Sequence, residues 1–232
     1  MLAIVVPYRD RASQFRTMFP ALTRYLVERA SQDFRIYVIE QAPGRPFNRG
    51  LIRNVGFALA RAAEAPDQVC FHDVDYVPVE ADFSPVDGPT RLIWHGLRNV
   101  EEYDRFFGGV VAMPSADFER INGYGNVYWE WGCEDVELRL RCTVAGLPIR
   151  YRDGRFRALL HRQEGVQRDG SLTDAAQRME DLFERRLPGL RDGSVQASDG
   201  LSTIAFREIE RQRIGMRELP DAPQAWRILV EV

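Results

Sequence analysis

The stretch "QVCFHDVDYVP" at residues 68–78 decides the fold class, because it completes an alternation of apolar runs with amphipathic segments. Two similar runs precede it, "LAIVVPY" at residues 2–8 and "FRIYVIEQ" at residues 34–41. Short runs that are almost wholly apolar are typical of strands buried on both faces of a sheet. We therefore predict three buried strands, the third of which ends at Pro78.

Helical spacing separates these strands. Apolar side chains recur every three or four positions from residue 11 to about residue 29, and "NRGLIRNVGFALARAAEA" at residues 48–65 predicts a second helix. This β-α-β-α-β order implies an α/β fold with a parallel sheet and right-handed crossovers. Ligands of such sheets bind beyond the carboxyl ends of the strands, so residues 7–11 and 73–75 should share one ligand-binding edge.

The rest of the chain is less regular. We expect a strand and a short helix within residues 106–125, and a helix over residues 134–145 that stops at Gly146. A hairpin around Asp153 and Gly154 is expected within residues 148–161. A helix near residues 173–185 and edge strands at the C-terminal end complete the prediction. No repeat or linker is visible, which favours one domain over residues 1–232.

Composition narrows the partners and the compartment. The 232 residues carry a formal net charge of −3, which argues against nucleic acid as the main partner, because phosphate binding usually requires a basic surplus. Three cysteines without CxxC spacing indicate neither a disulfide framework nor a zinc site. No signal peptide or transmembrane stretch is visible, so we expect a soluble, cytoplasmic protein.

Three residues are candidate metal ligands. Asp73 and Asp75 alternate along the predicted strand, so both carboxylates would lie on one face and could bind a divalent cation together with a phosphate. Acids that cap a loop are the simpler alternative, since a DxD pattern is common by chance. His161 ends the apolar run "RALLH" and could reach a cleft, although a lone histidine is more often structural.

Arginines and an aromatic follow the first two strands. Arg9 and Arg11 could hold a diphosphate or a nucleobase, because guanidinium groups bind phosphate in bidentate fashion. In "FNRG", Phe47 could stack on a base while Arg49 binds phosphate. The structural alternative is a solvated helix entry, capped in the second case by Asn48.

Two adjacent acids, Glu134 and Asp135, open the helix predicted from residue 134. Acids are favoured in a first helical turn without any function. However, Trp129, Trp131 and Gly132 stand directly before them, and aromatic faces beside carboxylates suit sugars. A helix N-terminus also keeps a carboxylate ionised, as a catalytic base requires.

Taken in order, these segments resemble the β-1,4-galactosyltransferase family, glycosyltransferase family 7. "VVPYRDR" resembles the family's P-F/Y-R-x-R segment, "FNRGLIRNVGF" its FNRAxLxNVGF and "FHDVDYVP" its DVD. "FFGGVVAMPSADFERINGYGNVYWEWGCEDVELRLR" is similar to YFGGVxAL…F…INGFxNxYWGWGGEDDDxxxRL. "GRFRALLH" and "SDGLSTIAF" parallel GRCRMIRH and SDGLNSLxY. The resemblance runs from Ile4 to the C-terminus, and several motifs in the right order make it specific.

The resemblance implies a GT-A fold, with a Rossmann-like nucleotide-binding half over about residues 1–80 and an acceptor-binding half over about residues 81–232, around a mixed central sheet. It implies an inverting transferase that uses Mn²⁺, or another divalent cation, to move galactose from a UDP-sugar donor, UDP-galactose. The acceptor would be a carbohydrate or a glycolipid. The family's stem and membrane anchor have no counterpart in the sequence, so we expect a bacterial-type soluble catalytic domain.

The same resemblance assigns residues to roles. Asp75 and His161 become metal ligands, Asp135 the catalytic base, and Glu134 the residue that orients the acceptor. Asp73 falls near the ribose or the metal shell, and Trp131 on a mobile loop that meets donor and acceptor. The residues assigned to the UDP-sugar site are Pro7, Tyr8, Arg9, Arg11, Phe47, Arg49, Asp73, Val74, Gly109 and Trp131.

Three departures from the family pattern bear on specificity. Val136 replaces the third acid of GEDDD, and "EDV" also occurs in chondroitin-type N-acetylgalactosaminyltransferases. Ala158 and Leu159 occupy the place of a further metal ligand, Met or His. Phe106 stands where a tyrosine restricts the donor to galactose. Its ring keeps the bulk that would crowd an N-acetyl group, so we favour UDP-galactose over UDP-GalNAc.

Two other classes compete with the transferase. An inactive sugar- or nucleotide-binding module would bind without turnover, indifferent to Asp135→Asn. A nucleotidyltransferase would share the Rossmann-like start and the paired acids, but it would release pyrophosphate from UTP. That class leaves the segment of tryptophans and acids without a role.

Overall fold

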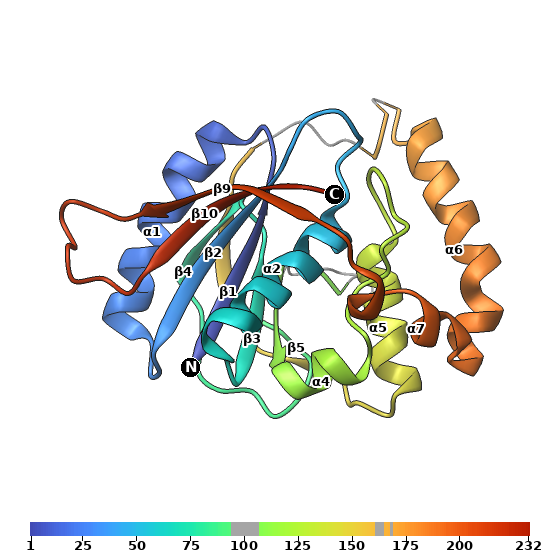
Figure 1. Cartoon of the computed structure of the whole chain (residues 1–232), viewed down its shortest axis with the longest axis horizontal. Helices are drawn as coiled ribbons and strands as arrows, with labels where there is room; N and C mark the ends of the chain where they lie inside the picture. Colours follow the sequence, from blue (N-terminus) through green and yellow to red (C-terminus); the bar gives the residue numbers. More distant parts are fainter. Residues whose placement is uncertain (94–106, 161–164, 168) are drawn as a thin grey trace.

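The computed structural model describes residues 1–93, 107–160, 165–167 and 169–232. A mixed sheet of eight strands runs through its centre (Figure 1). In order across the sheet these are β7 (Arg150–Tyr151), β5 (Thr90–Arg91), β6 (Val110–Pro114), β3 (Gln68–His72), β1 (Leu2–Tyr8), β2 (Phe34–Gln41), β10 (Ala225–Glu231) and β9 (Arg207–Ile214). Strand β1 pairs in parallel with both β2 and β3, which confirms the predicted parallel β-α-β-α-β start.

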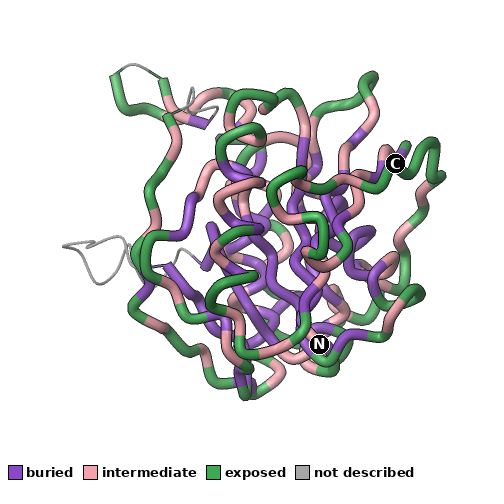
Figure 2. Tube along the Cα trace, turned by 90° about the vertical axis from the view of Figure 1, so that its left-hand side faces the viewer, coloured by how far each residue is buried: buried purple, intermediate pink, exposed green. Residues whose placement is uncertain are grey.

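Helices cover both faces of this sheet. Ile4 and Val6 of β1 pack in one cluster with residues of α1 (Ala12–Arg29) such as Leu22. Val5, between them, packs on the other face with residues of α2 (Arg49–Glu64). Burial on both faces explains why the strands read as continuous apolar runs rather than as alternating ones. Figure 2 shows the buried residues concentrated in the middle of the molecule.

Two local features fix α2 against the sheet. The Asn48 side chain accepts a hydrogen bond from the Leu51 amide at 2.9 Å, which confirms Asn48 as the N-cap. Farther along, Gly56 faces the strands so closely that a Cβ there would lie 2.4 Å from Cγ1 of Val5 and 2.8 Å from Cγ1 of Ile39. A glycine at this position therefore lets the helix backbone approach the sheet.

The prediction that the third strand ends at Pro78 is wrong. Strand β3 ends at His72, and after a turn a new strand, β4 (Tyr76–Glu80), leaves the main sheet. It pairs with β8 (Arg155–Ala158), in a separate antiparallel sheet. Pro78 is tolerated inside β4 because this two-stranded sheet has edges, and its register shifts between Pro78 and Glu80. Asp73 and Asp75 therefore lie on a turn and not on one face of a strand.

The hairpin predicted around Asp153 and Gly154 is also wrong. Strand β7 pairs in parallel with β5, whereas β8 pairs with β4, so the two segments belong to different sheets. Gly154 connects them where a Cβ would lie 1.8 Å from the carbonyl oxygen of Leu92. Residues 152–154 form no turn, and the two strands find their hydrogen-bond partners far away in the sequence.

The C-terminal strands match the prediction in part. Strand β9 lies at the edge of the main sheet, as expected. Strand β10 lies inside the sheet, between β9 and β2, and pairs in parallel with β2.

Four further helices and one 3₁₀ helix complete the described residues. These are α4 (Ser115–Arg120), α5 (Glu134–Val144), α6 (Asp174–Asp192), α7 (Ser194–Ser198) and the 3₁₀ helix η1 (Leu201–Thr203). The predicted start of α5 at Glu134 is confirmed, and α6 extends seven residues beyond the predicted end. Helices α5 and α6 share a small apolar cluster that includes Tyr128, Met179 and Phe183. Within the described ranges, no helix is long and apolar enough to span a membrane.

Candidate active site

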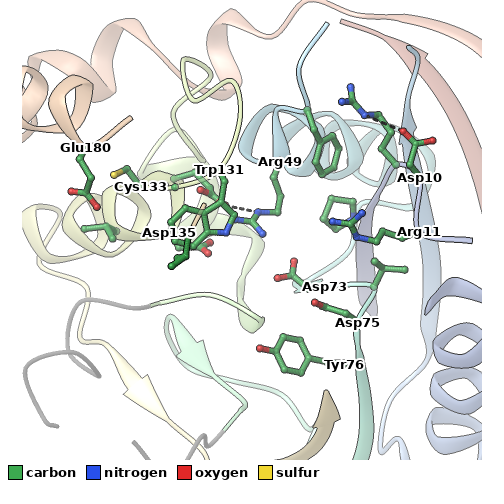
Figure 3. A pocket seen from close by; sticks show the side chains of 18 residues that line it. Asp10, Arg11, Arg49, Asp73, Asp75, Tyr76, Trp131, Cys133, Asp135 and Glu180 are labelled. Carbon is green, nitrogen blue, oxygen red and sulfur yellow. Dashed lines mark hydrogen bonds and ion pairs between the residues drawn. The ribbon is translucent and has the colours of Figure 1, made fainter. Parts of the chain in front are cut away.

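A cavity of about 490 Å³ opens at the carboxyl ends of β1 and β3, the edge that the sequence predicts for ligands. Such a volume lies in the usual range for small-molecule sites. The N-termini of α2 and α5 and one side of α6 close it (Figure 3). Its lining comprises Pro7, Arg9, Asp10, Arg11, Phe47, Arg49, Asp73, Val74, Asp75, Tyr76, Trp131, Gly132, Cys133, Glu134, Asp135, Val136, Val166 and Glu180.

One wall of the cavity is cationic and aromatic. Arg9, Arg11 and Arg49 line it together with Phe47. The Arg9 guanidinium carbon lies 5.5 Å from the centre of the Phe47 ring, and Arg9 Nη1 donates a 2.6 Å hydrogen bond to the carbonyl oxygen of Arg45. Guanidinium groups beside a flat aromatic ring can bind a phosphate and a planar base together.

The DVD turn also lines the cavity. Asp73 and Asp75 lie side by side with their carboxylates at the cavity (Figure 3). The Asp73 amide donates a 2.9 Å hydrogen bond to the carbonyl oxygen of Gly109, whose left-handed φ of 83° suits glycine. Burial opposes ionisation of Asp73, but the charges of Arg53 and Arg49 outweigh it and lower the pKa of this carboxyl. Asp73 is therefore held as a carboxylate.

Glu134 and Asp135 stand at the N-terminus of α5 with side chains that are almost fully buried. The Glu134 carboxylate accepts a hydrogen bond from Arg49, and Asp135 Oδ1 accepts one of 2.7 Å from Arg53. Burial raises the pKa of Asp135 to about 6; Arg53 opposes this rise and the negative charge of Glu134 adds to it. A carboxyl with that pKa is ionised at neutral pH, yet it is a stronger base than an ordinary aspartate.

Arg53 is a residue of the site that sequence reasoning missed. Its side chain is 1% exposed, and Nη2 donates a 2.6 Å hydrogen bond to Asp73 Oδ1 while Nη1 binds Asp135. In the family pattern FNRAxLxNVGF its position is unspecified. The available signal was that Arg53 lies one helical turn after Arg49, on the same face of α2.

Other lining residues gave weaker signals. Tyr76 and Cys133 adjoin motifs that the sequence analysis recognised, but no feature of the sequence indicated that their side chains line the site. Val166 and Glu180 come from the polar region after residue 164, and Glu180 projects into the cavity from α6 (Figure 3). Only the packing of α6 against α5 brings this carboxylate to the site.

The tryptophan segment has an unusual backbone. Trp131 lines the cavity and is 39% exposed; its ring lies over Gly165, where a Cβ would be 1.9 Å away. Glu130, Gly132 and Cys133 have φ values of 111°, 118° and 68°. The family pattern YWGWGGED has glycine at all three positions, so this chain places two larger residues in conformations that favour glycine.

Two predicted residues do not line the cavity. Tyr8 is buried beside Phe15, with ring centres 5.4 Å apart, and does not line the cavity. Gly109 accepts the hydrogen bond from the Asp73 amide through its carbonyl oxygen but does not line the cavity. His161 and Phe106 lie outside the described residues.

The donor set suits a hard divalent cation. Two carboxylates at one wall leave room for phosphate oxygens and water, the usual pattern when a metal binds a nucleotide. Among residues 1–93, 107–160, 165–167 and 169–232, no group of three or more His, Cys, Asp or Glu side chains gathers to form a complete site. Asp73 and Asp75 therefore provide an incomplete set that fits a cation shared with a ligand.

Comparison with known proteins identifies the family. Residues 1–84 match the family model described as the N-terminal region of glycosyl transferase group 7, and residues 96–163 match the model described as the N-terminal domain of galactosyltransferase. The chain is 34% identical to human β-1,4-galactosyltransferase 4 over 218 residues, and 32% identical to the rat protein over 219 residues. The chain belongs to the β-1,4-galactosyltransferase family. Each alignment covers 89% of this chain and 58% of the relative, so the chain spans less than two thirds of the length of these family members.

Solved structures show the same fold. The catalytic domain of Drosophila β-1,4-galactosyltransferase 7, in complex with xylobiose, superposes with a TM-score of 0.77 and 24% identity, covering 100% of this chain and 94% of that one. A mutant of that protein, in complex with manganese, UDP-Gal and xylobiose, gives a TM-score of 0.73 and 23% identity, with the same coverage. The mannosyltransferase PcManGT from Pyrobaculum calidifontis, in complex with GDP-Man and Mn²⁺, gives 0.50 and 13% over 85% of this chain and 73% of that one. The predicted GT-A α/β fold with a mixed central sheet is confirmed.

Proposed function

We propose that this chain transfers galactose from UDP-galactose to a hydroxyl group of a sugar acceptor and forms a β-linkage. The observation that carries the proposal is the position of Asp135, a buried carboxylate with a raised pKa that shares one cavity with an arginine wall and a DVD turn. Membership of the galactosyltransferase family supports the choice of donor. The Drosophila relative's complex with manganese, UDP-Gal and xylobiose supports the same reading.

The donor would lie along the arginines and beside the DVD turn. Arg9, Arg11 and Arg49 would bind the diphosphate, and Phe47 would stack on the base. Asp75, together with His161, would hold Mn²⁺. When bound, this cation would neutralise the negative charge that builds up on the UDP leaving group.

Asp135 would act as the general base. The acceptor hydroxyl gives its proton to the Asp135 carboxylate while its oxygen forms a bond to the anomeric carbon, on the face opposite UDP. The bond between that carbon and the phosphate oxygen breaks at the same time, and UDP leaves with the electron pair. A single displacement inverts the configuration, so an α-linked donor gives a β-linked product.

Residues around the base would select the acceptor. Glu134, held by Arg49, would accept hydrogen bonds from acceptor hydroxyls, and the exposed ring of Trp131 would pack on the C–H face of a sugar. Val136 places an apolar side chain in the same cavity. We infer a carbohydrate or glycolipid acceptor that presents no polar group to Val136.

A calorimetric titration of UDP-galactose, with and without Mn²⁺, tests the donor site without knowledge of the acceptor. We expect Mn²⁺ to strengthen binding. Asp75→Ala should weaken the Mn²⁺-dependent binding by at least about tenfold, the loss typical even for outer-shell partners of metal ligands. Asp87→Ala is the matched control, because this largely exposed acid pairs with Arg150 outside the cavity and should bind as the wild type does.

Two results would change the proposal. Binding that is indifferent to Mn²⁺ and to Asp75→Ala would favour an inactive binding module. Tighter binding of UDP-GalNAc than of UDP-galactose would change the donor and would place this chain with the chondroitin-type transferases.

A further inference from the structure

Arg53 joins three separate elements at the floor of the cavity. It extends from α2, binds Asp135 at the start of α5 through Nη1 at 2.7 Å, and binds Asp73 on the DVD turn through Nη2 at 2.6 Å. Its guanidinium carbon also lies 5.0 Å from the centre of the Tyr124 ring. With 1% of its side chain exposed, Arg53 is enclosed by these groups and does not itself line the cavity.

We propose that Arg53 is a positioning residue that fixes the general base Asp135 relative to the donor side of the cavity. This inference rests on the proposed function. It assigns a role to a residue that the family pattern leaves open, and it explains how the base and the DVD turn keep one relative position although they come from distant parts of the sequence.

The shape of the guanidinium group matters to this role. Its planar fork donates in two fixed directions, so the two carboxylates that it binds have a defined separation and orientation. Occupation of Asp135 Oδ1 by Arg53 sets the direction of the whole carboxylate. A base must meet its proton in the right geometry, and a displacement of about 1 Å can reduce the rate about 100-fold.

A purely structural role is the competing explanation. Two carboxylates with little exposure need a positive partner, and Arg53 would satisfy that need without any effect on the reaction. The variant Arg53→Lys distinguishes the positioning role from the structural role. Lysine keeps the positive charge, but its single ammonium group lacks the planar fork of two donors.

The test measures UDP released from UDP-galactose with Mn²⁺ and with xylobiose as the probe acceptor, or by the slower attack of water if xylobiose is not accepted. For Arg53→Lys we expect kcat to fall by about 10- to 100-fold, while KM for UDP-galactose changes far less. In Arg53→Met the charge that opposes protonation of Asp135 is lost, so the acid limb of the pH–kcat profile should move to higher pH. A structural role would leave the kcat of Arg53→Lys at the wild-type value at a temperature below the melting temperature.

Arg141→Lys is the matched control. Arg141 is a fully buried arginine of α5 that binds the Glu137 carboxylate, and it does not line the cavity. We expect this variant to melt at a lower temperature but to keep the wild-type kcat and pH profile at a temperature where it is folded.

The outcomes are distinct. Wild-type turnover with an unchanged kcat in Arg53→Lys would overturn the positioning role and leave the proposed function intact. A loss confined to KM for UDP-galactose would also overturn it, because Arg53 would then act on donor binding. If the wild type released no UDP at all, the proposed function would fail and this inference with it.

Discussion

At the scale of single residues, Asp135 combines two demands that conflict in solution. In the proposed mechanism it must be ionised at neutral pH and still be basic enough to take a proton from a hydroxyl group. Burial raises its pKa to about 6, and the hydrogen bond from Arg53 limits this rise. The N-terminus of α5 adds a favourable field for the anion. Both readings of the acidic pair, helix start and catalytic base, are therefore compatible.

The raised pKa predicts an acid limb in the activity. As pH falls through about 6, Asp135 takes up a proton and no longer serves as a base, so kcat/KM should decrease below that pH. The effect on stability has the opposite sign. The folded pKa lies above the value of about 3.9 for an unfolded aspartate, so this group stabilises the fold as pH falls from about 6 toward 4.

A pH–rate profile between pH 4.5 and pH 8, paired with thermal unfolding at each pH, checks this prediction. As the pH is lowered, activity should be lost at a higher pH than the one at which the protein unfolds. Full activity down to pH 5 would contradict the assignment of Asp135 as the base.

Several site residues were predictable because local chemistry marks them. The acids of the DVD turn, the arginines after β1 and the acidic pair at α5 each occur at the end of an element, and the structure brings them into one cavity. Arg53 and Glu180 were not predictable in this way. Each lies within a helix where a charged residue normally faces solvent, and only tertiary packing directs it to the site.

At the scale of elements, hydrophobic periodicity located α1, α2, β1 and β2 to within a residue or two, since burial on both faces leaves an unmistakable apolar run. The failures occurred where partners are remote. Strand β8 pairs with β4 rather than with its neighbour β7. The Asp153-Gly154 pair suggested a hairpin, but no turn forms there, and a local turn signal does not say which strands will pair.

The close packing of α2 against the sheet leads to a prediction for stability. In an ordinary helix Gly→Ala stabilises by about 1 kcal/mol. At Gly56 the added methyl would collide with Val5 and Ile39, so Gly56→Ala should instead destabilise by about 1–3 kcal/mol. Urea unfolding measures the difference. Ala62→Ser, at an exposed position of the same helix, should change stability by no more than about 0.5 kcal/mol.

The sign of the change in the free energy of unfolding shows whether α2 is held close to the sheet. If Gly56→Ala proves as stable as the wild type or more so, α2 has room to move outward, and the close approach to β1 is not a fixed feature of the fold.

At the scale of the whole molecule, the cavity takes its walls from distant parts of the chain. Residues of β1, α2 and the DVD turn supply the arginines and the two aspartates, whereas α5, α6 and the tryptophan segment supply Glu134, Asp135, Glu180 and Trp131. Arg49 and Arg53 bridge these parts through their bonds to Glu134 and Asp135. In the proposed mechanism, a donor bound at one side would be presented directly to an acceptor bound at the other.

The anomeric configuration of the product tests the central claim most directly. UDP-galactose and Mn²⁺ would be incubated with the protein and a panel of sugar acceptors that includes xylobiose, and the product would be examined by proton NMR. We expect a β-linked galactoside from the wild type, and a rate about 10²- to 10⁴-fold lower from Asp135→Asn, with UDP-galactose binding retained. An α-linked product, or transfer by Asp135→Asn at the wild-type rate, would contradict an inverting displacement with Asp135 as its base.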